Sequence, residues 1–129
     1  MWIMSENGFV SIVTKPNRPD TFTVRARDSK SLESFTAIDG GKIMRSPEGD
    51  YPYRVFVSHA TMAEWFLRLG ETATKYSNFK SRVAQTRPEM LGALHEVWAV
   101  MHQLEDVDAR EPLSDAELAE RIEFNQGVE

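Results

Sequence analysis

The apolar residues of this chain follow two different spacings, and the change between them limits the folds that it can adopt. In residues 1–57 they mostly alternate with polar residues, as in strands, whereas after Ser58 they recur every three or four residues, as in helices. The clearest alternation lies in residues 21–27, where the apolar residues at even positions face one way and Arg25 and Arg27 face the other. This pattern is typical of a half-buried antiparallel strand, so the sheet is expected in the first half of the chain.

Turn residues divide the first half into separate strands. Asn7-Gly8 lies between two apolar runs, and because both residues tolerate a positive φ, the pair predicts a hairpin at the N-terminus. Pro16 and Pro19 predict a loop before the next strand. Three more elements are expected before Ser58: a short helix at 31–38 that Gly40-Gly41 ends, a short strand at 42–45 and a longer strand at 51–57.

The second half predicts helices only. Ser58 can cap the first of them through its hydroxyl, and Ser114 with Glu117 forms a capping box before the last. The helices are expected at 58–74, 79–85, 88–105 and 115–124. The third carries a wide apolar stripe that we expect in the core, made of Leu91, Leu94, Val97, Trp98, Met101 and Leu104.

Strands first and helices after predict an α+β fold. We expect a small antiparallel sheet with an N-terminal hairpin, packed by helices from the C-terminal half of the chain. A ferredoxin-like sheet is one version of this arrangement. The 129 residues are enough for one modest core, which we place in residues 1–110, and residues 111–129 are expected to form an acidic C-terminal extension with a short helix.

Charge is distributed unevenly around a net value of −5. Residues 105–129 hold nine acids and two bases, while the other 104 residues hold thirteen bases and eleven acids. Nucleic-acid binders usually carry an excess of basic residues, which this chain lacks overall, although a local basic face is compatible with these numbers. The acidic segment can be a solvated surface or a docking segment for a basic partner.

Composition excludes several kinds of chemistry. The chain has no cysteine, which rules out disulfides, thiolate metal sites and a cysteine nucleophile. No apolar run approaches the roughly 18 residues of a membrane-spanning helix, and the N-terminus lacks the basic and apolar regions of a secretory signal. We therefore expect a cytoplasmic protein with no membrane partner.

The three histidines are the obvious candidates for catalysis or metal binding. His95 and His102 lie seven residues apart on one predicted helix, about 10 Å along its axis, which is too far for both to hold one metal ion easily. We expect them to be hydrogen-bonded or interfacial residues that flank Trp98. His59 lies at a strand-to-helix junction, but no residue near it in the sequence completes a catalytic site. We expect no metal, no cofactor, and a binding protein rather than an enzyme.

The arginines form a more informative group. Arg25 and Arg27 share one face of their strand, and Arg54 lies on a later strand. If these two strands are neighbours, one polar sheet face carries several guanidiniums beside Thr21 and Thr23. Because arginine forms bidentate contacts, such a face can bind phosphate, nucleic acid or an acidic protein. The alternative is an exposed face that nearby acidic residues balance.

Several segments carry a resemblance to known proteins: Met1-Trp2-Ile3 with Gly8-Phe9-Val10-Ser11, Val24-Arg25-Ala26-Arg27, Asp50-Tyr51-Pro52-Tyr53-Arg54-Val55, Tyr76-Ser77-Asn78-Phe79-Lys80 and Val97-Trp98-Ala99-Val100-Met101. In them the chain resembles a family of small uncharacterised proteins from actinobacteria and their bacteriophages. The resemblance covers residues 1–110 and implies a cytoplasmic accessory protein of phage or prophage origin, without naming an activity. Tyr76, Asn78 and Lys80 are the least obviously structural residues in these segments, so they join the candidate binding residues, although Asn78 can equally cap the helix that follows.

Three functional hypotheses follow. The first is a non-enzymatic binding or accessory protein that acts on a host or defence protein. The second is a nucleic-acid or nucleotide binder that uses Arg25, Arg27 and Arg54 on a sheet face. The third is a metal-dependent hydrolase or nuclease built on His59 and nearby acids. Sheet edges and many aromatic residues also favour self-association, so we expect a homodimer.

Overall fold

The computed structural model describes residues 1–127 of the chain. It divides into two units, Met1–Leu94 and His95–Glu129, and each is described by itself. The boundary that the sequence suggested, at residue 110, lies inside the second unit. Among the described residues, no helix is both long enough and apolar enough to cross a membrane.

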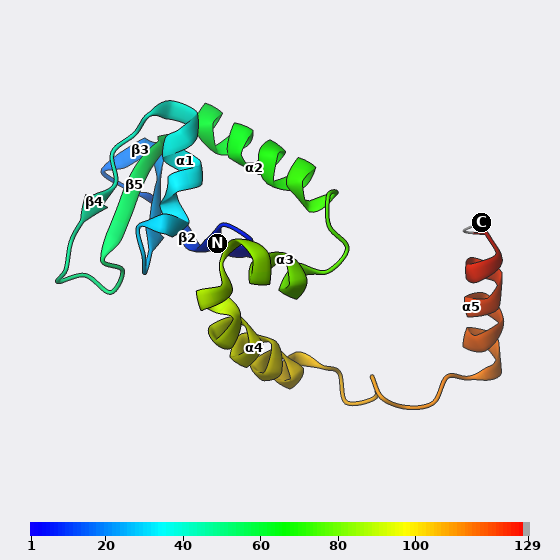
Figure 1. The fold of residues 1–129 in the computed structure, drawn as a ribbon. Helices are drawn as coiled ribbons and strands as arrows, with labels where there is room; N and C mark the ends of the chain where they lie inside the picture. Colours follow the sequence, from blue (N-terminus) through cyan, green and yellow to red (C-terminus); the bar gives the residue numbers. More distant parts are fainter. Residues whose placement is uncertain (128–129) are drawn as a thin grey trace. The chain divides into compact units, whose positions relative to one another are not determined.

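The first unit contains a five-stranded antiparallel sheet, which confirms the α+β class. The sheet order is β1-β2-β3-β5-β4, and Figure 1 shows α1 lying beside it. The strands are β1 (Trp2–Ser5), β2 (Gly8–Lys15), β3 (Arg18–Ala26), β4 (Met44–Arg45) and β5 (Tyr53–Ser58).

Two tight turns join the first three strands, so the ferredoxin-like version of the fold is not the one found. Ser5 pairs with Gly8, and Lys15 pairs with Arg18, which leaves two residues in each turn. A ferredoxin-like sheet needs a helix after its first strand, and a two-residue connection has no room for one.

The second turn also corrects the loop expected at Pro16–Pro19. β3 begins at Arg18, three residues earlier than the alternation suggested. Proline cannot donate a hydrogen bond to a neighbouring strand, but Pro19 is tolerated because β5 pairs with β3 only from Thr21 onward.

The predicted N-terminal hairpin is confirmed, but its two turn residues are Glu6 and Asn7 rather than Asn7 and Gly8, and Asn7 does not have a positive φ. Gly8 begins β2, and the hairpin depends on it. Gly8 has φ = +138°, a backbone conformation that residues with a side chain rarely adopt. A Cβ at this position would also overlap the hydroxyl of Ser31. Glycine is therefore needed here for both its conformation and its size.

Helices cover one face of the sheet. They are α1 (Glu33–Asp39), entered through the 3₁₀ turn η1 (Lys30–Leu32), and α2 (His59–Ala73). Phe35 stacks on Trp65 with ring centroids 4.3 Å apart, and the Trp65 indole donates a hydrogen bond to Ser34 Oγ at 2.9 Å. Each large side chain that is fully buried here contributes about 1.5–3 kcal/mol. The core consists of Val10, Ile12, Val24, Ala26, Leu32, Phe35, Val55, Val57, Met62 and Trp65.

The helix ends follow local sequence signals, as predicted. Ser58 Oγ accepts a hydrogen bond from the Thr61 backbone N–H at 3.1 Å and so caps α2. Gly40 ends α1 in the left-handed conformation, with φ = +69°.

The apolar stripe expected in the core between residues 88 and 105 is mostly exposed. The segment consists of η2 (Pro88–Met90), α4 (Leu91–Val100) and η3 (Met101–Leu104), after α3 (Phe79–Thr86). Leu94 is buried, but Trp98 is 55%, Met101 51% and Leu104 72% exposed. The prediction of a core stripe is therefore wrong beyond Leu94, because the boundary between the two units falls inside α4.

The second unit ends in α5 (Asp115–Gly127). Its predicted capping box is confirmed: Ser114 Oγ accepts from the Glu117 backbone N–H at 3.3 Å, and the Glu117 carboxylate accepts from the Ser114 backbone N–H at 2.8 Å. The acids of the predicted extension are exposed as far as the structure describes them, and Glu129 lies outside the described residues.

Candidate functional site

The sheet face opposite α1 and α2 carries the predicted arginines. In an antiparallel sheet, residues directly opposite each other on neighbouring strands share a face. The pairing register therefore aligns one row across all five strands: Trp2, Ser11, Arg25, Arg54 and Met44. The sequence predicted a shared arginine face only if the strands of Arg25 and Arg54 are neighbours. They are, because β3 pairs with β5 and Arg25 lies directly opposite Arg54.

A second row runs parallel to the first and contains Val13, Thr23 and Phe56. We call the two rows together, with Phe9, the open face. Phe9 belongs to it because its ring lies edge-on to that of Trp2, with centroids 5.9 Å apart.

Aromatic rings hold the guanidiniums of this face in place. Arg25 and Arg27 both lie over the ring of Tyr51, with Cζ atoms 4.7 and 4.8 Å from its centroid. Arg18 lies 3.9 Å above the ring of Phe56. Such contacts are worth about 0.5–1 kcal/mol at exposed sites, and they restrict the side chain before any ligand arrives.

Hydrogen bonds orient two of the same arginines further. Arg25 Nη2 donates to Ser11 Oγ at 2.9 Å, and Arg27 Nη1 donates to the Asp50 carbonyl at 2.9 Å. Both acceptors are neutral groups, so they leave the positive charge uncompensated.

No carboxylate forms an ion pair with these arginines within residues 1–127. The ion pairs of this part of the chain involve other cations, and none includes Arg18, Arg25, Arg27 or Arg54. The sequence-based alternative, a face balanced by nearby acids, is therefore not what these contacts show. Like charges directly opposite each other in a sheet are destabilising, so the pair formed by Arg25 and Arg54 costs the free protein stability.

Several polar atoms of this region are buried without a hydrogen-bond partner among the described residues. They are Thr21 Oγ1, Thr23 Oγ1, Arg25 Nε and Arg54 Nε. A buried donor or acceptor without a partner costs about 1–3 kcal/mol. The open face thus combines unpaired positive charge with unsatisfied donors, which is suited to an anionic ligand.

Sequence reasoning missed three residues beside the predicted arginines. Lys15, Arg18 and Phe56 line a hollow of about 200 Å³ together with Asn17, Thr23 and Arg54. The signal that could have found the two cations is the tight turn at residues 16–17, which places Lys15 opposite Arg18. The two prolines pointed to a longer loop instead.

The other candidate residues, Tyr76, Asn78 and Lys80, lie in the connection from α2 to α3 and in the first turn of α3. Asn78 Oδ1 accepts a hydrogen bond from the Ser81 backbone N–H at 2.9 Å, so it caps α3. Tyr76 and Asn78 line a hollow of about 360 Å³ that also includes Arg82. Lys80 is exposed and does not line this hollow. These three residues do not belong to the open face.

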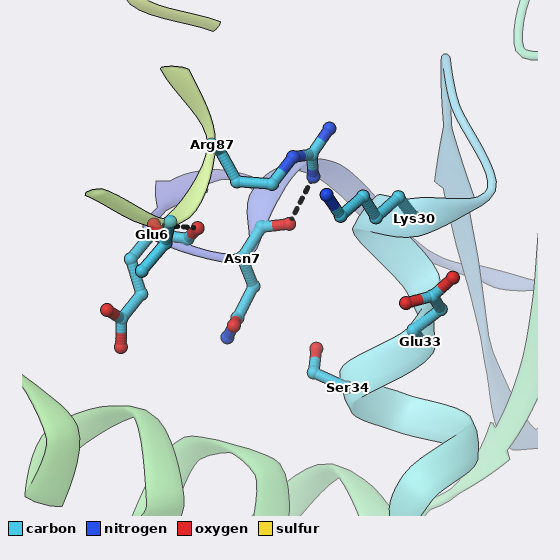
Figure 2. Close-up of a pocket in the computed structure, with 7 residues that line it drawn as sticks. Glu6, Asn7, Lys30, Glu33, Ser34 and Arg87 are labelled. Carbon is cyan, nitrogen blue, oxygen red and sulfur yellow. Dashed lines mark hydrogen bonds between the residues drawn. The ribbon is translucent and has the colours of Figure 1, made fainter. Parts of the chain in front are cut away.

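A second polar cluster surrounds Arg87, which is buried with 4% of its surface exposed. Its guanidinium donates to the Asn7 carbonyl at 2.7 Å, to Asp28 Oδ2 at 2.8 Å and to Glu89 Oε1 at 2.6 Å. Figure 2 shows the bond to Asn7, with the carboxylate of Glu6 pointing away. The bond to Asn7 ties the first hairpin turn to a residue 80 positions later in the chain, and the bond to Asp28 ties the segment after β3 to the same guanidinium.

Electrostatics in this cluster follow from the same bonds. Partial burial alone would raise the pKa of Asp28, but hydrogen bonds from Ser31 and from Arg87 lower it below its ordinary value. The hydrogen bond from Arg87 likewise lowers the pKa of Glu89. Because the pKa of each carboxyl is lowered, both are charged at neutral pH and together compensate the positive charge of Arg87. We call Arg87 with Asn7, Asp28 and Glu89 the clasp.

The hollow beside this clasp has a mixed charge, in contrast to the open face. It measures about 340 Å³, and Figure 2 shows Lys30, Glu33 and Ser34 lining it opposite Arg87 and Asn7. Glu6, also in its wall, forms an ion pair with Arg82. Acids and bases line this hollow in similar number, so it offers no preference for an anion.

The histidines have structural surroundings. The ring of His59 lies 4.8 Å from that of Phe22. His95 stacks on Trp98, and His102 lies edge-on to the same ring, as the sequence predicted for histidines flanking Trp98. In the part of the chain that the structure describes, no group of three or more His, Asp and Glu residues could hold a metal ion.

His102 takes part in a small charged cluster of the second unit. Its Nδ1 lies 2.6 Å from Glu105 Oε1, and Arg110 donates to both oxygens of the same carboxylate at 2.8 and 2.6 Å. The hydrogen bonds from Arg110 and then from His102 lower the pKa of Glu105 to about 2. The cluster is exposed, which is typical of a surface ion network.

Comparison with known proteins adds no relative: no protein-family model, curated protein or solved structure matches this chain. The resemblance to actinobacterial and phage proteins therefore stays a prediction. The candidate site rests on its own geometry.

Proposed function

We propose that this chain is a binding protein whose open face binds single-stranded nucleic acid. The observation that carries the proposal is the Arg25–Arg54 pair, which has no carboxylate partner in the described part of the chain and lies beside arginines stacked on aromatic rings. Phosphate groups are natural acceptors for such guanidiniums, because each can receive two parallel hydrogen bonds.

Exposed aromatic surface on the same face supports a nucleic-acid ligand over a simple anion. Trp2 begins the row that contains both arginines, and it is 73% exposed. Neighbouring strands are about 4.8 Å apart, so Trp2 and Arg54 are separated by about 14 Å along the row. A short strand of nucleotides can therefore place one base against Trp2 and a phosphate near Arg54 at the same time.

Single strands suit this face better than duplexes. Bases that are not stacked in a helix can lie on aromatic side chains of a sheet, and stacking contributes about 1–3 kcal/mol per base. The first unit, which contains the sheet, also has a positive formal charge: residues 1–94 hold thirteen bases and ten acids, although the whole chain has a net charge of −5. We therefore expect modest affinity that depends strongly on salt.

Fluorescence anisotropy with a labelled 12-nucleotide oligothymidylate tests the proposal. The full-length protein is compared with Arg54→Met and with Arg45→Met, which removes an equal charge from the neighbouring strand β4. We expect the logarithm of the affinity to fall with the logarithm of salt with a slope of about −2, as for three phosphate contacts. Arg54→Met should weaken binding several-fold and flatten the slope by about 0.7, whereas Arg45→Met should change little.

Two results would contradict the proposal. One is no binding at 50 mM salt with protein in the hundred-micromolar range. The other is equal affinity and equal salt dependence for the wild type and Arg54→Met.

A protein partner is the second candidate function, and a different observation favours it. The second unit exposes many large apolar side chains on its described residues: Trp98, Val100, Met101, Leu104, Val107, Leu113, Leu118, Ile122 and Phe124. Extended apolar surface of this kind often marks protein interaction sites. Such a partner fits the accessory role, with action on a host or defence protein, that the phage resemblance implies.

Native mass spectrometry of untagged protein tests this second candidate. A stoichiometric protein in the spectrum supports it, and a dimer mass supports self-association instead. A monomer with no retained protein counts against both.

A further inference from the structure

We infer that the hollow beside Thr23 is a site for a phosphate monoester. The inference rests on the proposed function for its ligand, the terminal phosphate of a nucleic-acid strand, but its evidence is separate. The pocket shares Arg54 with the row that contains Arg25, but it adds Lys15 and Arg18, which that row does not include.

The fold brings three cations to this hollow from three different positions. Lys15 ends β2 and Arg18 begins β3, and the two-residue turn between them sets them opposite each other. The register of β2 shifts between Thr14 and Lys15, and such an irregularity commonly re-aims a side chain. Arg54 arrives from β5, so the hollow lies where two strand pairs meet.

Among residues 1–127, no acid lines the hollow. Its walls are Lys15, Asn17, Arg18, Thr23, Arg54 and Phe56. Arg18 is held over the ring of Phe56 at 3.9 Å, so one cation is positioned in advance. The hollow beside Arg87, in contrast, contains two carboxylates in its wall.

A buried hydroxyl in the wall is the second, independent sign of a ligand. Thr23 is 1% exposed, and its Oγ1 has no hydrogen-bond partner among the described residues. Arg54 Nε in the same wall also lacks a partner. Buried polar groups are almost always hydrogen-bonded, so two unsatisfied groups around one hollow need an explanation. Both residues line the hollow, and a phosphate bound there would bring the acceptor oxygens that these two groups lack.

Size and charge select the ligand. The hollow measures about 200 Å³, less than the roughly 300 Å³ or more of pockets that enclose whole small molecules. It therefore admits a phosphate group and leaves the sugar and base outside, on the open face. A phosphate monoester carries a charge of about −1.5 to −2 at pH 7 because its second pKa is about 6, and three cations favour this charge over the single charge of a diester.

The test compares 8-nucleotide oligothymidylates that carry a 5′-phosphate, a 3′-phosphate or no terminal phosphate, all bound to the full chain and followed by anisotropy. We expect one phosphorylated form to bind at least fivefold more tightly than the unphosphorylated form at pH 7.5. The advantage should shrink at pH 5, where the monoester loses its second charge.

Two variants probe the hollow without touching Arg25 or Arg54. Lys15→Met removes one cation, and Thr23→Val removes the unsatisfied hydroxyl while keeping the shape of the side chain. Each should abolish most of the advantage of the terminal phosphate. Lys15→Met, which lies outside the two rows of the open face, should also leave binding of the unphosphorylated oligomer within twofold. Lys42→Met, in the segment before β4, is the control and should change neither quantity. Thr23→Val should not lower the melting temperature, so a loss of binding cannot be assigned to unfolding.

The outcomes separate the pocket from the proposed function. If all three oligomers bind equally well to every variant, the phosphate site is overturned and the function of the open face stands. If no oligomer binds, but inorganic phosphate raises the melting temperature of the wild type and not of Lys15→Met, the site holds a free phosphate and the nucleic-acid function is overturned. If neither oligomers nor inorganic phosphate bind, both proposals are wrong.

Discussion

Replacing Arg54 with methionine should make the free protein more stable. Arg54 lies directly opposite Arg25, has no ion pair among residues 1–127, and buries an Nε that lacks a partner. Methionine keeps most of the apolar length of the side chain but removes both the charge and the unsatisfied donor. A charged residue that weakens the free protein and forms no ion pair among residues 1–127 is expected at a binding site.

The size of the effect follows from the two removed costs. Two unit charges about 6 Å apart in a water-like dielectric repel by about 0.7 kcal/mol, which agrees with the roughly 0.2–1 kcal/mol of cross-strand pairs. Removal of the buried donor that lacks a partner adds to this gain, and imperfect packing of methionine subtracts from it. We expect a net gain of about 1 kcal/mol, which corresponds to about 4 °C in melting temperature for a domain of this size.

Urea unfolding followed by tryptophan fluorescence measures the change, at low salt and at 0.5 M salt. Salt screens repulsion between exposed charges, so the wild type should gain more from salt than Arg54→Met does. Arg45→Met, the matched control on β4, should stay within about 0.5 kcal/mol of the wild type. The reasoning is refuted if Arg54→Met is less stable than the wild type by more than about 0.5 kcal/mol, or if both respond equally to salt.

Three further predictions concern the rest of the fold. Gly8→Ala should destabilise the folded protein by about 2–4 kcal/mol, because alanine would have to adopt φ = +138° and its Cβ would overlap Ser31. Gly70→Ala, whose Cβ would meet nothing within 4 Å, should stabilise it by about 1 kcal/mol, and thermal unfolding compares the two variants. Arg87→Met should cost about 1.5–3 kcal/mol in urea unfolding, because it removes the hydrogen bonds that the buried guanidinium donates to the Asn7 carbonyl and to the half-exposed Asp28 carboxylate. An unchanged midpoint would show that the clasp is dispensable. Glu105 should titrate near pH 2 by carboxyl NMR, and Arg110→Ala should return its pKa toward 4.5. Because the pKa of Glu105 is lower in the folded protein, any stability from this pair is present above about pH 4.5 and is lost as the pH falls toward 2.

Local signals in the sequence were sufficient for most elements of the first unit. The alternation at 21–27 identified β3, the hydroxyl of Ser58 identified the start of α2, and Gly40 marked the end of α1. These features depend on residues within one turn or one strand, so the sequence displays them directly.

Features that depend on distant residues were not predictable. Arg87 is a polar residue in a polar stretch, and only the folded chain places it against Asn7 and Asp28. The prediction that the apolar stripe on α4 lies in the core was wrong for the same reason. Helical spacing shows which residues share a face but not whether another element covers that face.

The candidate site lies between these two cases. Alternation placed Arg25 on the polar face of its strand, but the register that brings Arg54 opposite it is a tertiary property. The hollow lined by Lys15 and Arg18 depends on the tight turn between them. The sequence did not predict this turn, because the two prolines indicated a longer loop.

The most direct test of the central claim is an NMR titration of the ¹⁵N-labelled full chain with unlabelled oligothymidylate, which records the backbone amides and the arginine Nε–H groups together. Binding on the open face predicts that the largest shifts occur in β2, β3 and β5 and include the Nε–H signals of Arg25 and Arg54. Shifts confined to residues 95–127 or to α3, or no shifts at millimolar oligomer, would contradict the claim that the arginine-bearing sheet face is the binding surface.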